Sequence, residues 1–294
     1  MKKLFVYLIA LSVLLPTTMV AANSTPQKPP KITRPSKPIS KPNVRPRTPA
    51  KPTPKPTLKP QTRATWNQST NTLNVNGISY RMIPVQGGTF QMGSNDGDSD
   101  EKPVHSVTLS SYYIGQTEVT QALWKAVMGS SNPSWCEGDN KPVERVSWND
   151  CQTFITKLNQ LTGEHFRLPT EAEWEFAAKG GRKSRGFKYS GSNTIGDVAW
   201  YDDNSGYETH VVATKSPNEL GIYDMSGNVW EWCQDWYGDY SSSSQTNPTG
   251  SFSGSYRVSR GGSWTFDAAR CRAARRSGFT PTNSYGALGL RLAL

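Results

Sequence analysis

Apolar residues along the chain form a few helical repeats separated by many short stretches. Between Ser147 and Gly163 they recur at the spacing of one helix face, which predicts a helix there. The residues of this face are Cys151, Phe154, Ile155, Leu158 and Leu161. A second helix is predicted from Thr170, because Thr170 and Glu173 form a capping-box pair, and a shorter one is predicted over residues 120–128.

Four other stretches have the composition and pattern typical of strands, and they are residues 80–85, 104–109, 112–114 and 257–258. The segments between them are rich in Gly, Ser, Asn and Asp, so we expect much irregular backbone. Such a fold needs further stabilisation. Buried Trp side chains, cysteine bridges or bound cations can supply it.

The N-terminus carries one apolar run, residues 4–16, directly after Lys2 and Lys3. The run is shorter than the roughly 20 residues that span a bilayer and is followed by small residues up to Ala22. It predicts a secretory signal peptide over residues 1–22. The mature protein is therefore expected to be secreted, periplasmic or in the cell envelope, and not transmembrane after cleavage; an uncleaved anchor is the alternative.

The net charge of +10 is not spread evenly over the chain. Residues 23–63 hold seven Lys, four Arg, twelve Pro and no acidic residue, whereas residues 64–294 carry −3. The first segment is predicted to be a disordered, extended Pro/Lys-rich linker, and its charge could also attract an anionic envelope polymer. Because the globular part is mildly acidic, nucleic acid is not an expected partner.

Residues 64–294 contain a series of distinctive motifs. In order, they are Gly87-Gly88-Thr89-Phe90-Gln91-Met92-Gly93, Glu118-Val119-Thr120, Val146-Ser147-Trp148-Asn149-Asp150, Arg167-Leu168-Pro169-Thr170-Glu171-Ala172-Glu173-Trp174-Glu175, Gly227-Asn228-Val229-Trp230-Glu231-Trp232 and Arg260-Gly261-Gly262-Ser263-Trp264. With these motifs in this order, the segment resembles the formylglycine-generating enzyme family, also called sulfatase-modifying factor domains. The resemblance implies a single compact α+β domain, related to C-type-lectin-like folds, low in regular secondary structure and stabilised by calcium.

The resemblance also implies the calcium ligands. They would be the side chains of Asp224 and Glu231 and the backbone carbonyls of Met225, Gly227 and Val229. Carboxylates and carbonyls in a tight loop suit a hard cation that takes six to eight oxygens. The alternative is that Asp224 caps a turn and Glu231 pairs with an arginine. The acidic segment 95–101 also spaces carboxylates like a calcium loop, but it lacks the distal Glu of an EF-hand, which favours a solvated loop.

Oxidases of this family hold copper(I) with two cysteines that follow the Gly-Gly-Ser turn, three and eight residues after the serine. Soft thiolates are natural ligands for that ion. Counted from Ser263, these positions are Phe266 and Cys271. Cys271 is thus a candidate catalytic residue whose partner is replaced by an aromatic ring, and one thiolate does not make the two-coordinate site. By the same resemblance, Trp230, Ser263 and Trp264 would line a substrate groove.

Cys271 also has a structural interpretation. An exported protein with an even number of cysteines favours disulfides, and Cys233 and Cys271 both lie beside family core motifs. A Cys233–Cys271 bridge is the leading pairing. Cys151 is either a buried free thiol or a partner of Cys136.

Three functions are therefore open. The first is a calcium-stabilised module that binds a peptide, protein or glycan through the family's groove and lacks the paired copper cysteines. The second is an oxidase that converts a sulfatase cysteine to formylglycine with copper. The third is a structural component of the cell envelope.

Overall fold

The structure, a computed structural model, describes residues 63–294. The expected signal peptide, residues 1–22, and all of the expected linker except Arg63 lie outside the described residues, so both stay predictions. Residues 63–294 form one α+β domain that has little regular secondary structure, as expected. Within that range, no helix combines the length and the apolar character needed to cross a bilayer.

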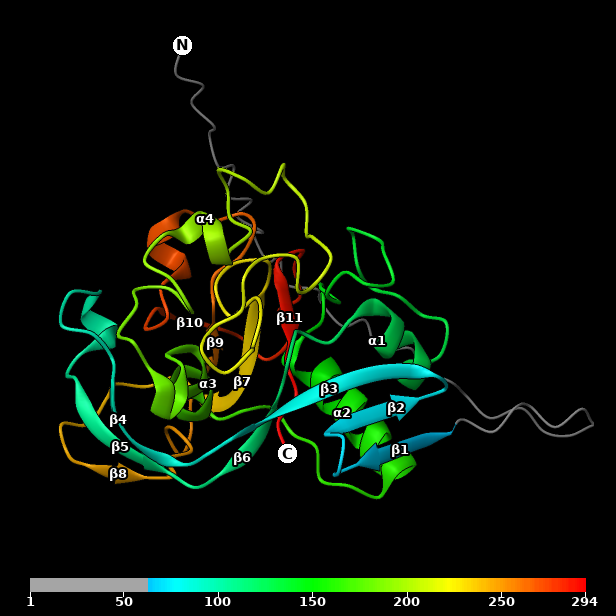
Figure 1. Ribbon diagram of the computed structural model, residues 1–294, viewed down its shortest axis with the longest axis horizontal. Coiled ribbons are helices and arrows are strands. Elements are labelled where there is room, and N and C mark those ends of the chain that lie inside the picture. The colour runs from blue at the N-terminus through cyan, green and yellow to red at the C-terminus, as the bar shows by residue number, and fades with distance from the viewer. Residues whose placement is uncertain (1–62) are drawn as a thin grey trace, which may run out of the picture. The chain divides into compact units, whose positions relative to one another are not determined.

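Within residues 63–294, eleven short strands form three small sheets (Figure 1). The first sheet has the order β1-β2-β3-β6, with β1 at Ala64–Asn67, β2 at Thr72–Val75, β3 at Ile78–Val85 and β6 at Tyr112–Gly115. The second has the order β10-β9-β7-β11, with β10 at Arg276–Phe279, β9 at Arg257–Arg260, β7 at Trp230–Trp236 and β11 at Leu288–Leu290. The third has the order β4-β5-β8, with β4 at Gly88–Met92, β5 at His105–Leu109 and β8 at Gln245–Thr246.

Three helices start where the sequence predicts them, namely α1 at Gln121–Met128, α2 at Trp148–Thr162 and α3 at Glu171–Ala178. A further short helix, α4 at Ile195–Val198, was not predicted. Thr120, Ser147 and Thr170 cap the first three through their side chains. The capping box of Thr170 and Glu173 is present, and α2 ends at a left-handed Gly163. These caps satisfy amide groups that a helix end leaves unpaired.

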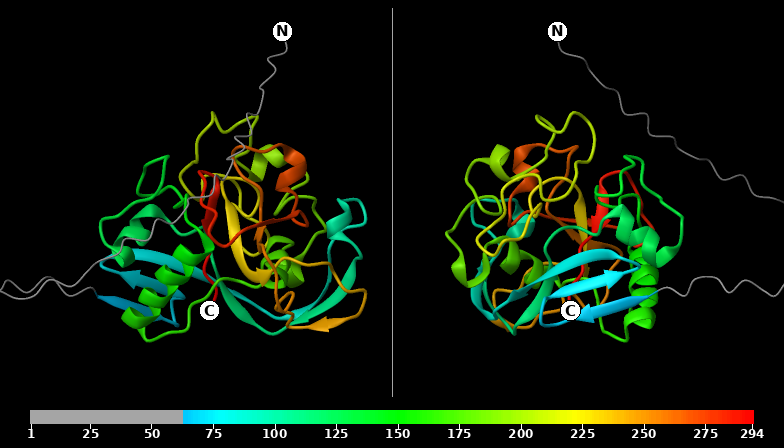
Figure 2. Two further views of the ribbon diagram at one scale, coloured as in Figure 1. Left: turned by 180° about the vertical axis from the view of Figure 1, so that it is seen from behind. Right: turned by 45° about the vertical axis from the view of Figure 1, so that its right-hand side comes forward.

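Two main apolar clusters are buried in residues 63–294, and the first of them includes Trp230 and Trp232 of β7. In the first, α1 and α2 pack on the sheet of β1 to β3, and this packing can be followed in both views of Figure 2. In the second, α3 packs against β4, β7 and β9. The predicted apolar face of α2 is buried as expected, with Leu161 at its edge.

The C-terminal residues join segments that are distant in sequence. Strand β11 pairs in parallel with β7, where Gly289 lies opposite Glu231. The amides and carbonyls of Ala293 and Arg167 exchange two hydrogen bonds of 2.8 and 2.9 Å, and Leu294 does the same with Tyr113. The end of the chain is thus built into the core.

Candidate functional site

Cys271 lies in a tight pocket of backbone behind the Gly-Gly-Ser turn. Its side chain is buried beside Tyr189 and Val198. At Gly262, with φ of +75°, a β-carbon would come within 2.6 Å of the Cys271 sulfur, so only glycine fits there. Burial raises the pKa of the Cys271 thiol to about 12, and the thiol is therefore neutral at physiological pH.

The expected disulfide between Cys233 and Cys271 is not formed. All four cysteines lie in the described part of the chain, and all four are free thiols. Cys233 is on β7 in the cluster under α3, whereas Cys271 belongs to a separate small cluster. The prediction relied on two motifs being near the core, but those motifs face different parts of it. The open alternative of a Cys136–Cys151 bridge is also not realised, and Cys151 is a buried free thiol.

The copper(I) donor set is incomplete in space as well as in sequence. Phe266, at the position of the missing cysteine, packs edge-on against Trp230 with ring centroids 5.8 Å apart. The three other cysteines are in the two main clusters or, for Cys136, on a half-exposed loop. One buried neutral thiol does not fit a linear two-thiolate site.

Of the three expected groove residues, only Trp264 reaches the surface. Trp230 and Ser263 are buried, in agreement with the structural alternatives of a core indole and a corner residue. Trp264 is half-buried, and its indole Nε1 donates to the carbonyl of Gly286 at 2.8 Å.

Trp264 nevertheless lies near a second tryptophan, Trp135, at Gly286. We call these two residues, Trp135 and Trp264, the aromatic surface. Trp135 is 76% exposed, and a β-carbon on Gly286, the residue whose carbonyl accepts from Trp264, would lie 3.7 Å from the Trp135 ring. Glu144, which is buried, accepts a hydrogen bond of 2.8 Å from the Cys136 amide and so holds the loop of Trp135 in place.

The expected calcium loop contains an unsatisfied pair of buried carboxylates. Asp224 Oδ2 accepts from the Ala213 amide at 2.7 Å, while Oδ1 has no partner. Glu118 Oε1 accepts from the Asn228 amide group at 3.0 Å, and its Oε2 has no partner either. Burial raises the pKa of both carboxyl groups, and the charge of Asp224 raises that of Glu118 further. Two orphaned carboxylate oxygens side by side fit a hard cation such as calcium.

The loop backbone is shaped around this pair. Asp224 and Asn228 have φ of +57° and +58°, and Gly227 has φ of +81°. A β-carbon on Gly227 would lie 2.3 Å from the Trp200 carbonyl oxygen, so the loop needs glycine at this position. The carbonyls of Met225, Gly227 and Val229 stay predicted ligands.

Glu231, the other predicted calcium ligand, is engaged elsewhere. Both of its oxygens accept from Arg291, at 2.6 and 2.9 Å, and Oε2 also accepts from the Trp174 indole at 2.7 Å. This is the arginine pairing that the sequence left open as the alternative. Glu118 takes the place beside Asp224 instead. Its motif was visible in the sequence, but its proximity to residue 224 depends on the fold.

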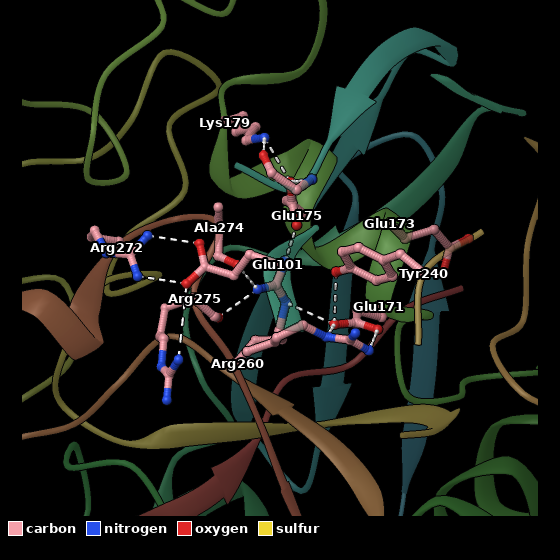
Figure 3. Close-up of polar contacts among 12 residues, drawn as sticks. Glu101, Glu171, Glu173, Glu175, Lys179, Tyr240, Arg260, Arg272, Ala274 and Arg275 are labelled. Carbon is pink, nitrogen blue, oxygen red and sulfur yellow. Dashed lines mark hydrogen bonds and ion pairs between the residues drawn. The ribbon is translucent and has the colours of Figure 1, made fainter. Parts of the chain in front are cut away.

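The acidic segment 95–101 is exposed over most of its length, as expected for a solvated loop, but its last residue is not. Glu101 is fully buried and pairs with Arg272 at 2.5 Å, and Arg275 pairs with the exposed Asp98. Asp98, Asp100 and Glu101 come close enough together to hold a cation. The two arginines already neutralise much of this charge (Figure 3).

Figure 3 also shows the buried Arg260 and its partners. Arg260 pairs with Glu175 and donates to the Ala274 carbonyl at 2.7 Å. Lys179, one turn further along α3, pairs with the same glutamate at 2.6 Å. Burial alone would raise the pKa of Glu175, but Lys179 and Arg260 outweigh it and hold the pKa below its usual value.

Comparison with known proteins agrees with this geometry. The model of the sulfatase-modifying factor enzyme 1-like domain matches residues 68–294. The chain belongs to the sulfatase-modifying factor family. The family oxidases include the formylglycine-generating enzyme of Streptomyces coelicolor, which is 31% identical over 282 residues, covering 72% of this chain and 88% of that protein.

Other members of the sulfatase-modifying factor family carry different names. The chaperone protein LppX of Paenibacillus barcinonensis is 37% identical over 237 residues, which cover 64% of this chain and 79% of that one. Among solved structures, Treponema denticola variable protein 1 has a TM-score of 0.71 at 38% identity, covering 76% of this chain and 97% of its own. PvdO from Pseudomonas aeruginosa has a TM-score of 0.59 at 27% identity, covering 72% of this chain and 93% of the PvdO chain.

Proposed function

We propose that this protein is an exported, calcium-stabilised module of the sulfatase-modifying factor family that binds a segment of another protein and does not oxidise it. The observation that carries the proposal is the state of Cys271, a neutral thiol enclosed by backbone, with a phenylalanine where the second sulfur would be. A copper(I) site needs accessible thiolates.

The aromatic surface supports the binding part of the proposal. Large aromatic side chains give much contact area at low entropic cost and are frequent among residues that dominate binding energy. Trp135 stands out from the surface on a loop held by Glu144. The similarity to a protein named a chaperone favours a polypeptide ligand, and a glycan is the alternative that the experiment must distinguish.

Binding is tested with the full chain, a permanently unfolded carboxymethylated protein and a glycan panel. We expect the unfolded protein to bind, and the changes Trp135→Ala and Trp264→Ala to weaken binding by about 2 kcal/mol each. Phe252→Ala is the control, because Phe252 is an exposed aromatic residue that lies outside the aromatic surface. Binding of glycans alone, or equal losses in all three variants, would refute the proposal.

The absence of oxidation is tested separately. With copper and a Cys-x-Pro-x-Arg peptide, we expect no oxygen consumption above that of a Cys271→Ser variant. Turnover that disappears in that variant would establish the oxidase alternative.

A further inference from the structure

A pocket of about 490 Å³ lies between the end of β7, the start of α3 and the loop 238–251. It shares no residue with the surroundings of Cys271, the aromatic surface or the expected calcium loop. Its volume is within the range of small-molecule sites. The inference drawn from it is independent of the proposed function.

Asp235 is the distinctive group of this pocket. Its side chain is 3% exposed, and Oδ2 accepts from the backbone amide of Glu171 at 3.0 Å. No ion pair formed within residues 63–294 includes Asp235. Gly250 lies against it, since a β-carbon there would come within 2.9 Å of Oδ1. A buried carboxyl group without a cation is uncommon, because burial of a charge is costly unless the charge is paired.

The pocket's own cation is already committed. Arg276 donates to both oxygens of Glu171 at 2.8 Å and to the carbonyls of Asp100 and Gly238, and its guanidinium stacks on the Tyr240 ring. Every carboxylate oxygen of Glu171 is thereby occupied. Asp235 and, at the rim, Asp239 are therefore the carboxyl groups of the pocket lining that a ligand can pair with.

Charged groups on several elements face Asp235. They are Glu171 and Glu173 on α3, Arg276 on β10, Arg257 on β9, Arg167, and in the pocket lining Asp239 and His105. Burial raises the pKa of Asp235 to about 8, and the negative charge of Glu171 adds to the effect. Without a ligand, the carboxyl group is therefore mostly protonated at neutral pH.

We infer that this pocket binds a ligand carrying a protonated amine or a guanidinium group, which pairs with the carboxylate of Asp235. A cation supplies the one partner that this buried group lacks, and pairing in a low-dielectric site is strong. Hydroxyl and amide groups at the rim, from Ser241, Gln245, Thr246 and Thr249, can bind the polar remainder of such a ligand.

Proton linkage follows from this pairing. Because the cation binds the ionised form, binding releases a proton below pH 8, and affinity rises with pH up to about 8 and is level above it. A ligand that merely donates hydroxyl groups to the neutral acid would show no such rise.

The test is calorimetry on the full chain with Nα-acetyl-arginine methylamide and Nα-acetyl-lysine methylamide. The citrulline counterpart is the neutral isostere, and N-acetylglucosamine represents hydroxylated ligands. We expect both cationic probes to bind, release of nearly one proton at pH 7, and affinity that rises about tenfold per pH unit below pH 8. The citrulline compound should bind about 30-fold more weakly or worse.

Two variants test whether Asp235 is the residue that pairs with the cation. Asp235→Asn keeps an acceptor for the Glu171 amide and should lower the affinity for the cations about 30-fold or more, and remove its pH dependence. Asp239→Asn, at the exposed rim, should change affinity less than about threefold. If Asp235→Asn does not fold, the proton release measured on the unchanged protein decides whether the cation pairs with a carboxyl group that ionises on binding.

Several results would overturn the inference. They are equal binding of the citrulline compound, binding of the saccharide alone, unchanged affinity in Asp235→Asn, cation binding without proton release at pH 7, and no binding of either cationic probe at about 10 mM.

Discussion

Individual carboxyl groups in this domain divide into those that an arginine pairs and those that none pairs. Glu231, Glu171 and Glu175 each have a buried arginine as partner. Among the buried carboxyl groups of residues 63–294, Glu118, Glu144, Asp224 and Asp235 form no ion pair with an arginine. The first set holds sheets and helices together, whereas the second set consists of buried acids whose charge no arginine neutralises.

Removal of one partner from a buried pair should be costly. Arg260→Leu leaves Glu175 buried with only Lys179 beside it, and we expect a loss of about 3–5 kcal/mol in the free energy of unfolding. Lys125→Met, at the exposed pair with Asp139, is the control and should cost less than about 1 kcal/mol. Urea unfolding measures both; similar losses would show that the buried pair has no special role.

Two buried carboxyl groups should give pH dependences of opposite sign. The pKa of Glu175 is lowered in the fold, so its contribution is complete above the usual carboxyl pKa and is lost as pH falls through the lowered value. The pKa of Asp235 is raised to about 8, so the folded state loses stability as pH rises from about 4 toward 8, by up to about 1.4 kcal/mol per pH unit.

Unfolding measured from pH 3 to pH 9 checks these signs. Glu175→Gln should flatten the acid side of the stability profile, whereas Asp235→Asn should flatten the decline between pH 4 and pH 8. If the stability profiles of both variants ran parallel to that of the unchanged protein, these pH dependences would not come from Glu175 and Asp235.

At the scale of elements, local sequence signals predicted helix ends well. Thr170 caps α3 and Ser147 caps α2, as their spacing to Glu173 and Asp150 indicates. Strand β7 was not predicted, because both of its faces are largely buried and its sequence, which includes Glu231 and Asp235, does not alternate between a buried apolar and an exposed polar face.

Contacts between elements could not be predicted in the same way. The pairing of Glu118 with Asp224, the separation of Cys233 from Cys271 and the burial of Asp235 all depend on which segments the fold brings together. No local rule of spacing contains that information. The resemblance predicted the family, which is confirmed, whereas its calcium loop stays a prediction. The pairing of Glu231 with an arginine had been left as an alternative, and only the fold identifies that arginine as Arg291.

The cap of α3 can be tested directly. Thr170→Ala removes the acceptor for the Glu173 amide and should lower the free energy of unfolding by about 1 kcal/mol. Thr153→Ala, at an exposed position within α2, should change it by less than about 0.5 kcal/mol. Thermal unfolding of the three proteins measures the difference, and an unchanged midpoint for Thr170→Ala would argue against the capping box.

For the whole molecule, the unpaired carboxylates at residues 118 and 224 predict stabilisation by calcium. Calcium at about 100 times its dissociation constant should add about 2.7 kcal/mol to the free energy of unfolding, and a chelator should reverse this. Glu118→Gln and Asp224→Asn should abolish the calcium response, while Asp96→Asn, on the exposed acidic segment, should keep it. A response lost only in Asp96→Asn would move the site to that segment.

Residues 288–294 bond to β6, β7 and Arg167, which come much earlier in the chain. Without these residues, β7 has no parallel neighbour in β11 and the second sheet loses one edge strand. A polypeptide truncated before residue 288 would therefore expose the apolar side chains of β7 and be prone to aggregate.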